Sequence, residues 1–390
     1  RSSTVRVNGE TCFAQNIPPL GYAVVAPKHS DGSIQVQQYS AENRYFRLHF
    51  DAHYNLMSIF DKEAQREVLD LSKGLGNQLE AYEDFPRDYD AWEITNYYKE
   101  KRYLVNDVTE AEAVHDGVRA GIRIRRKFLT SEIVQTIWLY EDIKKIDFET
   151  TIDWKQEHLL LKAAFPVSIN SNRATYEIQF GTVERPTHSN TSWDAAKFEV
   201  CAHKYCDYSE YGYGVALMND CKYGHDVHDG VMRLTLLKSA TYPNPDADRC
   251  MHAFTYSLAP HIGDYRVTGI VQMAYDLNQP MEAIPVNQQA GALADSYSLA
   301  QVSEANVILE TVKKSESGDA LIFRLYDAYN EHRENVEITF GFDASHAYLC
   351  SMMEEDLQEL SLCERSVHLT VKPFEIVTLK VYPNDKGEAQ

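Results

Sequence analysis

Residues 83–93 (EDFPRDYDAWE) place carboxylates close to aromatic rings, directly after a glycine-rich turn. Asp90 lies there between Tyr89 and Trp92. Sites that recognise sugars combine carboxylates, which accept hydrogen bonds from hydroxyl groups, with aromatic faces that pack on the C–H side of a pyranose ring. The segment is therefore a candidate carbohydrate contact. A polar surface loop pinned by one buried tryptophan would have the same composition, so both interpretations stand.

A second candidate is the segment Pro243–His252 (PNPDADRCMH). Two prolines stiffen it, and Arg249 follows Asp246 and Asp248. A rigid loop that presents one guanidinium group can donate directional hydrogen bonds to neighbouring sugar hydroxyls. An arginine paired with its own neighbouring carboxylates is equally compatible with this sequence.

Two further segments carry metal-ligating residue types. In residues 201–207 (CAHKYCD), a strand would put Cys201 on one face and Cys206 on the other, which disfavours a shared ion. Residues 225–229 (HDVHD) end in Asp-Gly, which favours a solvated hairpin tip over a metal site. We therefore assign no metal ligand from the sequence.

No pattern in these residues names a reaction. A glycosidase needs two carboxylates that flank the scissile bond, and no stretch identifies such a pair. The sequence also lacks a GxSxG motif, a phosphate-binding glycine loop and an HExxH motif. No catalytic residue is assigned to this chain.

The elements that must position these segments are β-strands. Apolar and polar residues alternate with period two, as in strands with one buried face, in residues 46–50, 134–140, 146–154, 231–237, 321–325, 336–340 and 367–371. Turn signals such as Asp116-Gly117 and Asp229-Gly230 separate the strands, and helices are expected to be short, as over Ser192–Val200. The pattern predicts an all-β protein.

Three blocks are expected in the chain. Residues 1–37 hold one strand pair and the end of a small sandwich, and residues 38–285 form one large two-sheet sandwich. A polar, linker-like stretch (NQQAGALADSYS) opens residues 286–390, where a smaller sandwich of about immunoglobulin size follows.

Charge and hydropathy exclude several classes of protein. The formal net charge is −20, and the one dense basic run, Arg119–Lys127, alternates with isoleucines as on the solvent side of a strand. A nucleic-acid partner is therefore excluded, because it needs a concentrated basic face. No apolar stretch is long enough to span a membrane, so no membrane partner is expected. Homo-oligomerisation is left open.

The seven cysteines are odd in number and scattered, which is typical of reduced cytoplasmic thiols rather than of a disulfide framework. The chain starts RSSTVRV, without methionine or an apolar leader. We expect residue 1 not to be the natural start, so a targeting signal of the parent chain cannot be read here.

Long strings in the middle of the chain resemble glycoside hydrolase family 38, in particular α-mannosidases of the cytosolic and bacterial type. They are YEIQFGTVERPTH (176–188), NTSWDAAKFEVCAHKYCDYSEYGYGVALMNDCKYG (190–224), MRLTLLKSATYPNPDADR (232–249) and HAFTYSLAPH (252–261). The shorter strings IPPLGY (17–22), YDAWEI (89–94) and NVILETVKKSE…LIFRLYDA (306–328) are also similar to that family. The resemblance spans nearly the whole chain.

The resemblance implies a large mutarotase-like supersandwich with smaller β-sandwich pieces at either end. Members of the family carry zinc, an Asp nucleophile and an Asp acid/base on a barrel domain that precedes these sandwiches. Both catalytic carboxylates and the zinc ligands are thus expected upstream of residue 1, and this chain alone is expected to be inactive. Its partners would be its own N-terminal catalytic domain and a mannoside or oligosaccharide substrate.

By the same resemblance, Arg249 matches an arginine that points toward the substrate, and Tyr89, Asp90 and Trp92 belong to a loop at the pocket mouth. The family places glycine after this arginine, whereas Cys250 stands here. Glycine adopts positive φ without strain and cysteine does not, so the local loop geometry is expected to differ.

Two other functions are compatible with a supersandwich of this kind. A stand-alone carbohydrate-binding module would use the aromatic and acidic residues of 83–93. A sugar epimerase would need a general acid and base, for which His188 or His252 with a nearby glutamate could be proposed, although no spacing supports the pair.

Overall fold

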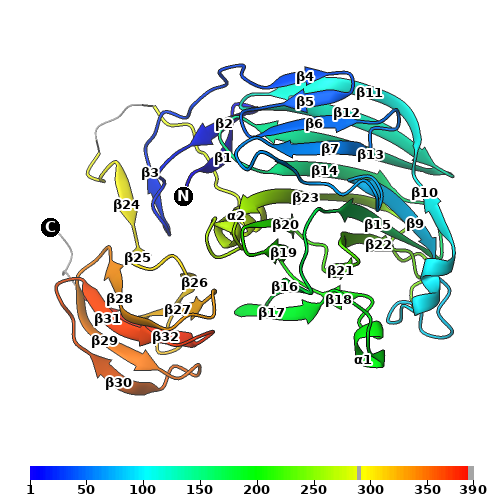
Figure 1. Cartoon of the computed structure of the whole chain (residues 1–390). Helices are drawn as coiled ribbons and strands as arrows, with labels where there is room; N and C mark the ends of the chain where they lie inside the picture. The colour runs from blue at the N-terminus through cyan, green and yellow to red at the C-terminus, as the bar shows by residue number, and fades with distance from the viewer. Residues whose placement is uncertain (288–290, 385–390) are drawn as a thin grey trace.

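The computed structural model describes residues 1–287 and 291–384, and strands dominate it. Figure 1 shows a large body at the upper right and a smaller one at the lower left, with helix α2 between them. Helices in the described residues are α1 (Ser192–Ala195), α2 (Ile270–Asn278) and a 3-10 turn, η1 (Asn96–Glu100). The all-β expectation is confirmed.

One layer of the large body is a nine-stranded antiparallel sheet. Its order is β11 (Asp107–Asp116), β12 (Arg119–Phe128), β13 (Ser131–Tyr140), β14 (Ile146–Asp153), β23 (Met251–Ile262), β20 (Tyr213–Asn219), β19 (Tyr205–Glu210), β16 (Arg173–Ile178) and β17 (Gly181–Pro186). Strand β23 therefore returns from late in the chain to pair with β14 in the middle of the sheet.

Two smaller sheets form the opposite layer. The first is β4 (Gln35–Gln37), β5 (Ser40–Glu42), β6 (Phe46–Phe50), β7 (Leu56–Asp61) and β8 (Arg66–Glu67). The second is β10 (Arg102–Leu104), β9 (Gln78–Glu83), β15 (Leu159–Pro166), β22 (Val231–Lys238), β21 (Gly224–His228) and β18 (Val200–Cys201). Two isolated backbone bridges connect these two sheets. Leu56 in β7 pairs with Gly76, just before β9, and Leu69, just after β8, pairs with Val167, just after β15.

The core between these layers explains the alternating pattern. In β6, Phe46, Leu48 and Phe50 are buried while the two residues between them are exposed. One continuous apolar cluster extends from Ile34 to Leu258 and draws on all three sheets. Antiparallel sheets with one buried face produce this alternation, because successive side chains point to opposite faces.

The basic run on β12 departs from the expectation that it faces solvent. Arg126 is fully buried, because even-numbered positions of this strand share the inner face with Ile122 and Ile124. Its Nη2 donates to the carbonyl oxygens of His53 (3.2 Å) and Tyr54 (3.1 Å). Burial lowers the pKa of Arg126 to about 10.

The small sandwich follows near the C-terminus. Its sheets are β25 (Ala300–Val302), β28 (Arg333–Phe340) and β31 (Ser366–Val371), facing β26 (Val307–Lys314), β27 (Leu321–Asp327), β32 (Ile376–Pro383), β29 (Ala344–Cys350) and β30 (Asp356–Leu360). Its own apolar cluster includes Phe323, Ile338, Phe340 and Leu379.

Helix α2, which the sequence analysis did not anticipate, joins the two bodies. Its buried residues Ile270, Val271 and Ala274 pack in one cluster with side chains from the outer face of the nine-stranded sheet and from the small sandwich, namely Tyr205, Ala216, Met218, Ala259, Tyr326, Ala328 and Tyr329. The bodies are thus connected by a shared apolar contact as well as by the chain.

The first residues form a hairpin, β1 (Ser3–Val7) with β2 (Glu10–Ala14), and β3 (Gly21–Ala23) pairs with β24 (Ser296–Ser298). Part of the expected linker, residues 288–290, lies outside the described residues. The block boundaries at residues 37 and 285 remain predictions.

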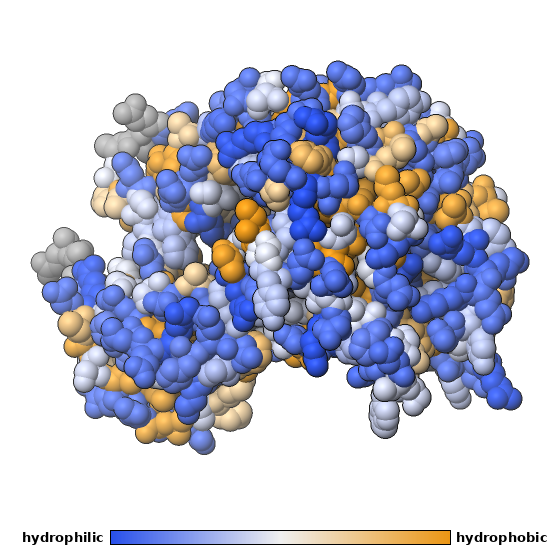
Figure 2. All heavy atoms as spheres, in the orientation of Figure 1, coloured by the Kyte–Doolittle hydropathy of each residue, from blue (hydrophilic) through white to orange (hydrophobic). Residues whose placement is uncertain are grey.

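The visible surface is mostly hydrophilic, with scattered apolar side chains (Figure 2). Among the described residues, the structure contains no helix of the length and apolar character that a membrane crossing requires. None of the seven cysteines, all of which are described, takes part in a disulfide.

Candidate functional site

Three exposed aromatic rings meet where the loop after β9 approaches the loop after β22. Strand β9 lies at the right-hand end of the large body in Figure 1. Tyr89 and Trp92 lie in the loop after β9, and Tyr242 lies in the loop after β22. Their ring centroids are 5.7–6.4 Å apart, while 63%, 70% and 55% of these residues' surfaces stay exposed. Trp92 is therefore not the buried anchor of a surface loop. This aromatic triad offers faces suited to a pyranose ring.

Asp90 holds the two loops of the triad together. Its carboxylate accepts hydrogen bonds from the backbone N–H groups of Thr241 (2.7 Å) and Tyr242 (2.8 Å), and from the Thr241 hydroxyl (3.1 Å). Burial opposes ionisation, but these hydrogen bonds outweigh it and lower the pKa of Asp90. The structure thus gives this carboxylate a positioning role between the two loops that carry the aromatic rings.

Replacing Asp90 by alanine is expected to loosen the triad. Charge-assisted hydrogen bonds to a partly buried carboxylate contribute about 1.5–3 kcal/mol each in favourable cases, so we expect the free energy of unfolding to fall by roughly 1–3 kcal/mol. Urea denaturation measures this loss. Asp88→Ala in the same loop is the control, because Asp88 is exposed, and an equal effect of both changes would contradict the positioning role.

The loop between β14 and β15 connects the triad to Arg249. The ring of His158 stacks on Phe85 with centroids 4.7 Å apart, and its Nδ1 lies 3.7 Å from Asp90. Glu157, the preceding residue, accepts a hydrogen bond of 2.6 Å from Nη1 of Arg249. The structure therefore brings all four predicted site residues, Tyr89, Asp90, Trp92 and Arg249, to one corner.

Arg249 is partly exposed and paired with carboxylates. Besides Glu157, its Nη1 lies 3.3 Å from Asp246, and both contacts use the same nitrogen. The positive φ of this loop falls at Asp248 (61°), not at Cys250. The chain therefore turns one residue before Arg249, and Cys250 needs no strained backbone.

Neither segment with metal-ligating residue types contributes to a group of three such side chains among the described residues. Cys201 is exposed on β18 and Cys206 is buried on β19, in different sheets. His225 and Asp226 lie buried within β21, so the expectation of a solvated tip holds only for the turn after the strand. Burial lowers the pKa of His225 to about 3.

A buried ionic network lies in the six-stranded sheet below η1. Lys162 pairs with Glu199 and, at 2.8 Å, with Asp226. Arg233 contacts Asp226 at 3.1 Å and Glu80 at 3.3 Å. These groups satisfy one another inside the protein, which indicates a structural role.

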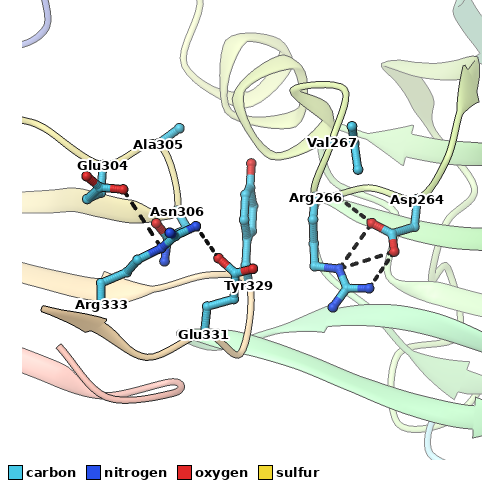
Figure 3. A pocket seen from close by; sticks show the side chains of 9 residues that line it. All are labelled: Asp264, Arg266, Val267, Glu304, Ala305, Asn306, Tyr329, Glu331 and Arg333. Atoms are coloured by element: carbon cyan, nitrogen blue, oxygen red, sulfur yellow. Dashed lines mark hydrogen bonds and ion pairs between the residues drawn. The ribbon is translucent and has the colours of Figure 1, made fainter.

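The cavity at the junction of the two bodies is not part of this corner. It has a volume of about 570 Å³ and lies between the loop after β23 and the small sandwich (Figure 3). Arg266 pairs there with Asp264, and Arg333 pairs with Glu331. Both guanidinium groups of the cavity are thus already paired with carboxylates, and no predicted site residue lines it.

Comparison with known proteins agrees with the fold. The model "Glycosyl hydrolases family 38 C-terminal domain" matches residues 41–246, and "Glycosyl hydrolases family 38 C-terminal beta sandwich domain" matches residues 306–379. Alpha-mannosidase 2C1 of Homo sapiens is 36% identical over 93% of this chain, and the alpha-mannosidase of Saccharomyces cerevisiae is 36% identical over 68%. The crystal structure of an alpha-mannosidase from Enterococcus faecalis has a TM-score of 0.76 at 18% identity, covering 90% of this chain and 43% of that one.

These findings define the class as the β-sandwich portion of a glycoside hydrolase. The chain belongs to family 38, whose C-terminal domain and C-terminal β-sandwich domain it contains. The resemblance expected from the sequence is confirmed. The chain spans 36% of the length of the human relative and 26% of the yeast relative.

Proposed function

We propose that these 390 residues form the C-terminal part of an α-mannosidase, the activity named for several relatives. The intact enzyme would hydrolyse α-linked mannosides with retention of configuration, which uses a covalent intermediate and two carboxyl groups about 5–5.5 Å apart. The present chain would pack against the catalytic domain and contribute loops to the sugar pocket.

The observation that carries this proposal is the convergence of the aromatic triad with Arg249. The triad supplies apolar faces, and Arg249 supplies a guanidinium group whose contacts with Glu157 and Asp246 both use Nη1. Its remaining N–H groups can donate to the hydroxyls of a bound sugar. Asp90 joins the loops of the triad and lies 3.7 Å from His158, and the preceding Glu157 pairs with Arg249.

The zinc ion implied for the intact enzyme does not fit this corner. Among the described residues, one group combines three metal-ligating side chains, and it includes none of the corner's residues. We therefore propose that residues outside this chain hold the catalytic zinc.

A stand-alone carbohydrate-binding module is the second candidate, favoured by the exposed triad itself. Calorimetric titration of the purified chain with mannose and methyl α-mannoside separates the two functions. Our proposal expects no millimolar binding, since the catalytic domain supplies the rest of the pocket. Millimolar or tighter binding that Trp92→Ala abolishes would instead establish the binding module.

In the intact enzyme, Arg249→Ala is expected to lower kcat/KM by about 5- to 150-fold. This corresponds to roughly 1–3 kcal/mol, the range for losing a hydrogen bond to a charged group. Steady-state kinetics on an aryl α-mannoside measure the change. Arg173→Ala is the control, because Arg173 is exposed and its recorded ion pair joins it to Glu184 on the neighbouring strand. Unchanged kinetics for Arg249→Ala would show that this loop does not touch substrate.

We also propose that the intact enzyme resides in the cytoplasm. Free thiols at all seven cysteines suit a reducing compartment. Cell fractionation of a tagged intact enzyme tests this, and recovery within secretory vesicles would contradict it.

A further inference from the structure

Three metal-ligating side chains meet at the N-terminal hairpin. In Figure 1 this hairpin, β1 and β2, lies at the other end of the large body from β9. Glu10 and Cys12 belong to β2, and His29 lies in the segment after β3. The Cys12 sulfur is 3.6 Å from Nδ1 of His29, and the same nitrogen is 3.6 Å from Oε2 of Glu10. All three ligand atoms lie within 4.8 Å of one another.

Local backbone structure brings these residues together. Glu10 and Cys12 are two positions apart on a strand, so their side chains point to the same face. Phe13 and Lys28 form a bridge with two backbone hydrogen bonds, of 2.8 and 2.9 Å, which places His29 beside β2. The cluster thus rests on paired backbone and not on chance contact between loose side chains.

Two of the three ligand separations are close to those around a tetrahedral ion. With bonds of about 2.3 Å to sulfur and about 2.1 Å to nitrogen and oxygen, tetrahedral zinc separates sulfur from nitrogen by about 3.6 Å and nitrogen from oxygen by about 3.4 Å. The two measured separations are both 3.6 Å. Little movement would therefore be needed for an ion to enter.

We propose that Cys12, His29 and Glu10 bind a divalent transition-metal ion, zinc in the first instance, with water in the fourth position. A thiolate and an imidazole select zinc over magnesium or calcium, which prefer oxygen ligands. The Cys12 thiol releases its proton to solvent as the sulfur–metal bond forms. The ion would fasten the segment that carries His29 to the hairpin.

The three ligands of this site differ from the residues of the corner formed by the aromatic triad and Arg249. A metal ion can reach this site from solvent, because Glu10 and His29 are exposed, and Cys12 is buried. An ion can therefore enter from solvent while its sulfur ligand stays shielded.

Cobalt substitution of the purified 390-residue chain tests the proposal. Tetrahedral cobalt bound to a thiolate gives an intense sulfur-to-metal charge-transfer band together with visible d–d bands. We expect these bands at one equivalent of Co²⁺, their loss on adding Zn²⁺, and a higher melting temperature with Zn²⁺ than with Mg²⁺.

Variants locate the site. Cys12→Ala and His29→Ala are expected to remove the charge-transfer band, and Glu10→Gln to weaken cobalt binding at least tenfold. His29 and Glu10 are exposed, so their variants should fold even if Cys12→Ala does not. The matched control is Cys250→Ala, because Cys250 lies 3.7 Å from His252 yet belongs to no three-ligand group among the described residues. A band that persists in His29→Ala, or no band in the unmodified chain, would overturn the proposal.

Discussion

Incubated alone with an aryl α-mannoside, the 390-residue chain is expected to show no turnover above the uncatalysed rate. Glycoside hydrolysis with retention needs one carboxylate free to attack the sugar and a second to protonate the leaving group. The two buried carboxylates near the triad are already engaged, Asp90 with Thr241 and Tyr242, and Asp84 with Lys238. Because enzymes accelerate reactions by about 10⁶-fold or more, the contrast with the intact enzyme should be unmistakable.

Reconstitution provides the control for this experiment. Co-expression of the chain with the remaining part of the intact enzyme is expected to restore turnover, and the Arg249→Ala chain to restore less of it. Turnover by the purified chain alone, abolished by Asp84→Asn or Asp90→Asn, would contradict our assignment of the catalytic carboxylates to other residues.

Replacing Lys162 by methionine is expected to lower the free energy of unfolding by about 3–5 kcal/mol, because it leaves buried carboxylates without their cation. Lys162 is fully buried, and its charged partners Asp226 and Glu199 hold its pKa above the usual value although burial alone would lower it. Denaturation in urea measures the loss. The exposed pair Arg123–Glu112 is the comparison, since removing Arg123 should cost at most about 1 kcal/mol.

A second variant separates lost charge pairing from lost packing. In the double variant Lys162→Met with Glu199→Met, Asp226 still pairs with Arg233. We therefore expect the double variant to regain part of the lost stability. A double variant less stable than Lys162→Met alone would show that packing, not an uncompensated charge, causes the loss.

Local patterns predicted much of the fold. The alternation over residues 46–50 corresponds to β6. Applied to β12, the same period-two alternation places Arg126 on the face of the buried isoleucines. Helix α2 also had a local signal, since Ile270, Val271 and Ala274 share one helical face and Pro280 follows. These features depend on neighbours close in the chain.

The candidate site could be predicted only in part. Tyr89, Asp90, Trp92 and Arg249 were found from residue type and resemblance, whereas Tyr242 was missed. Nothing near Tyr242 in the sequence identifies it, because it joins the triad through a backbone hydrogen bond to Asp90, which lies 152 residues away. The partners of Lys162 are likewise 37 and 64 residues distant.

The sequence by itself determined the all-β class, most strands and the family, because side-chain alternation and long matching strings are properties of consecutive residues. Only the tertiary structure decided which loops meet, that Asp90 joins the two loops carrying the aromatic rings, and that Glu10, Cys12 and His29 converge. Those facts depend on sheet pairing between distant segments, which no local pattern specifies.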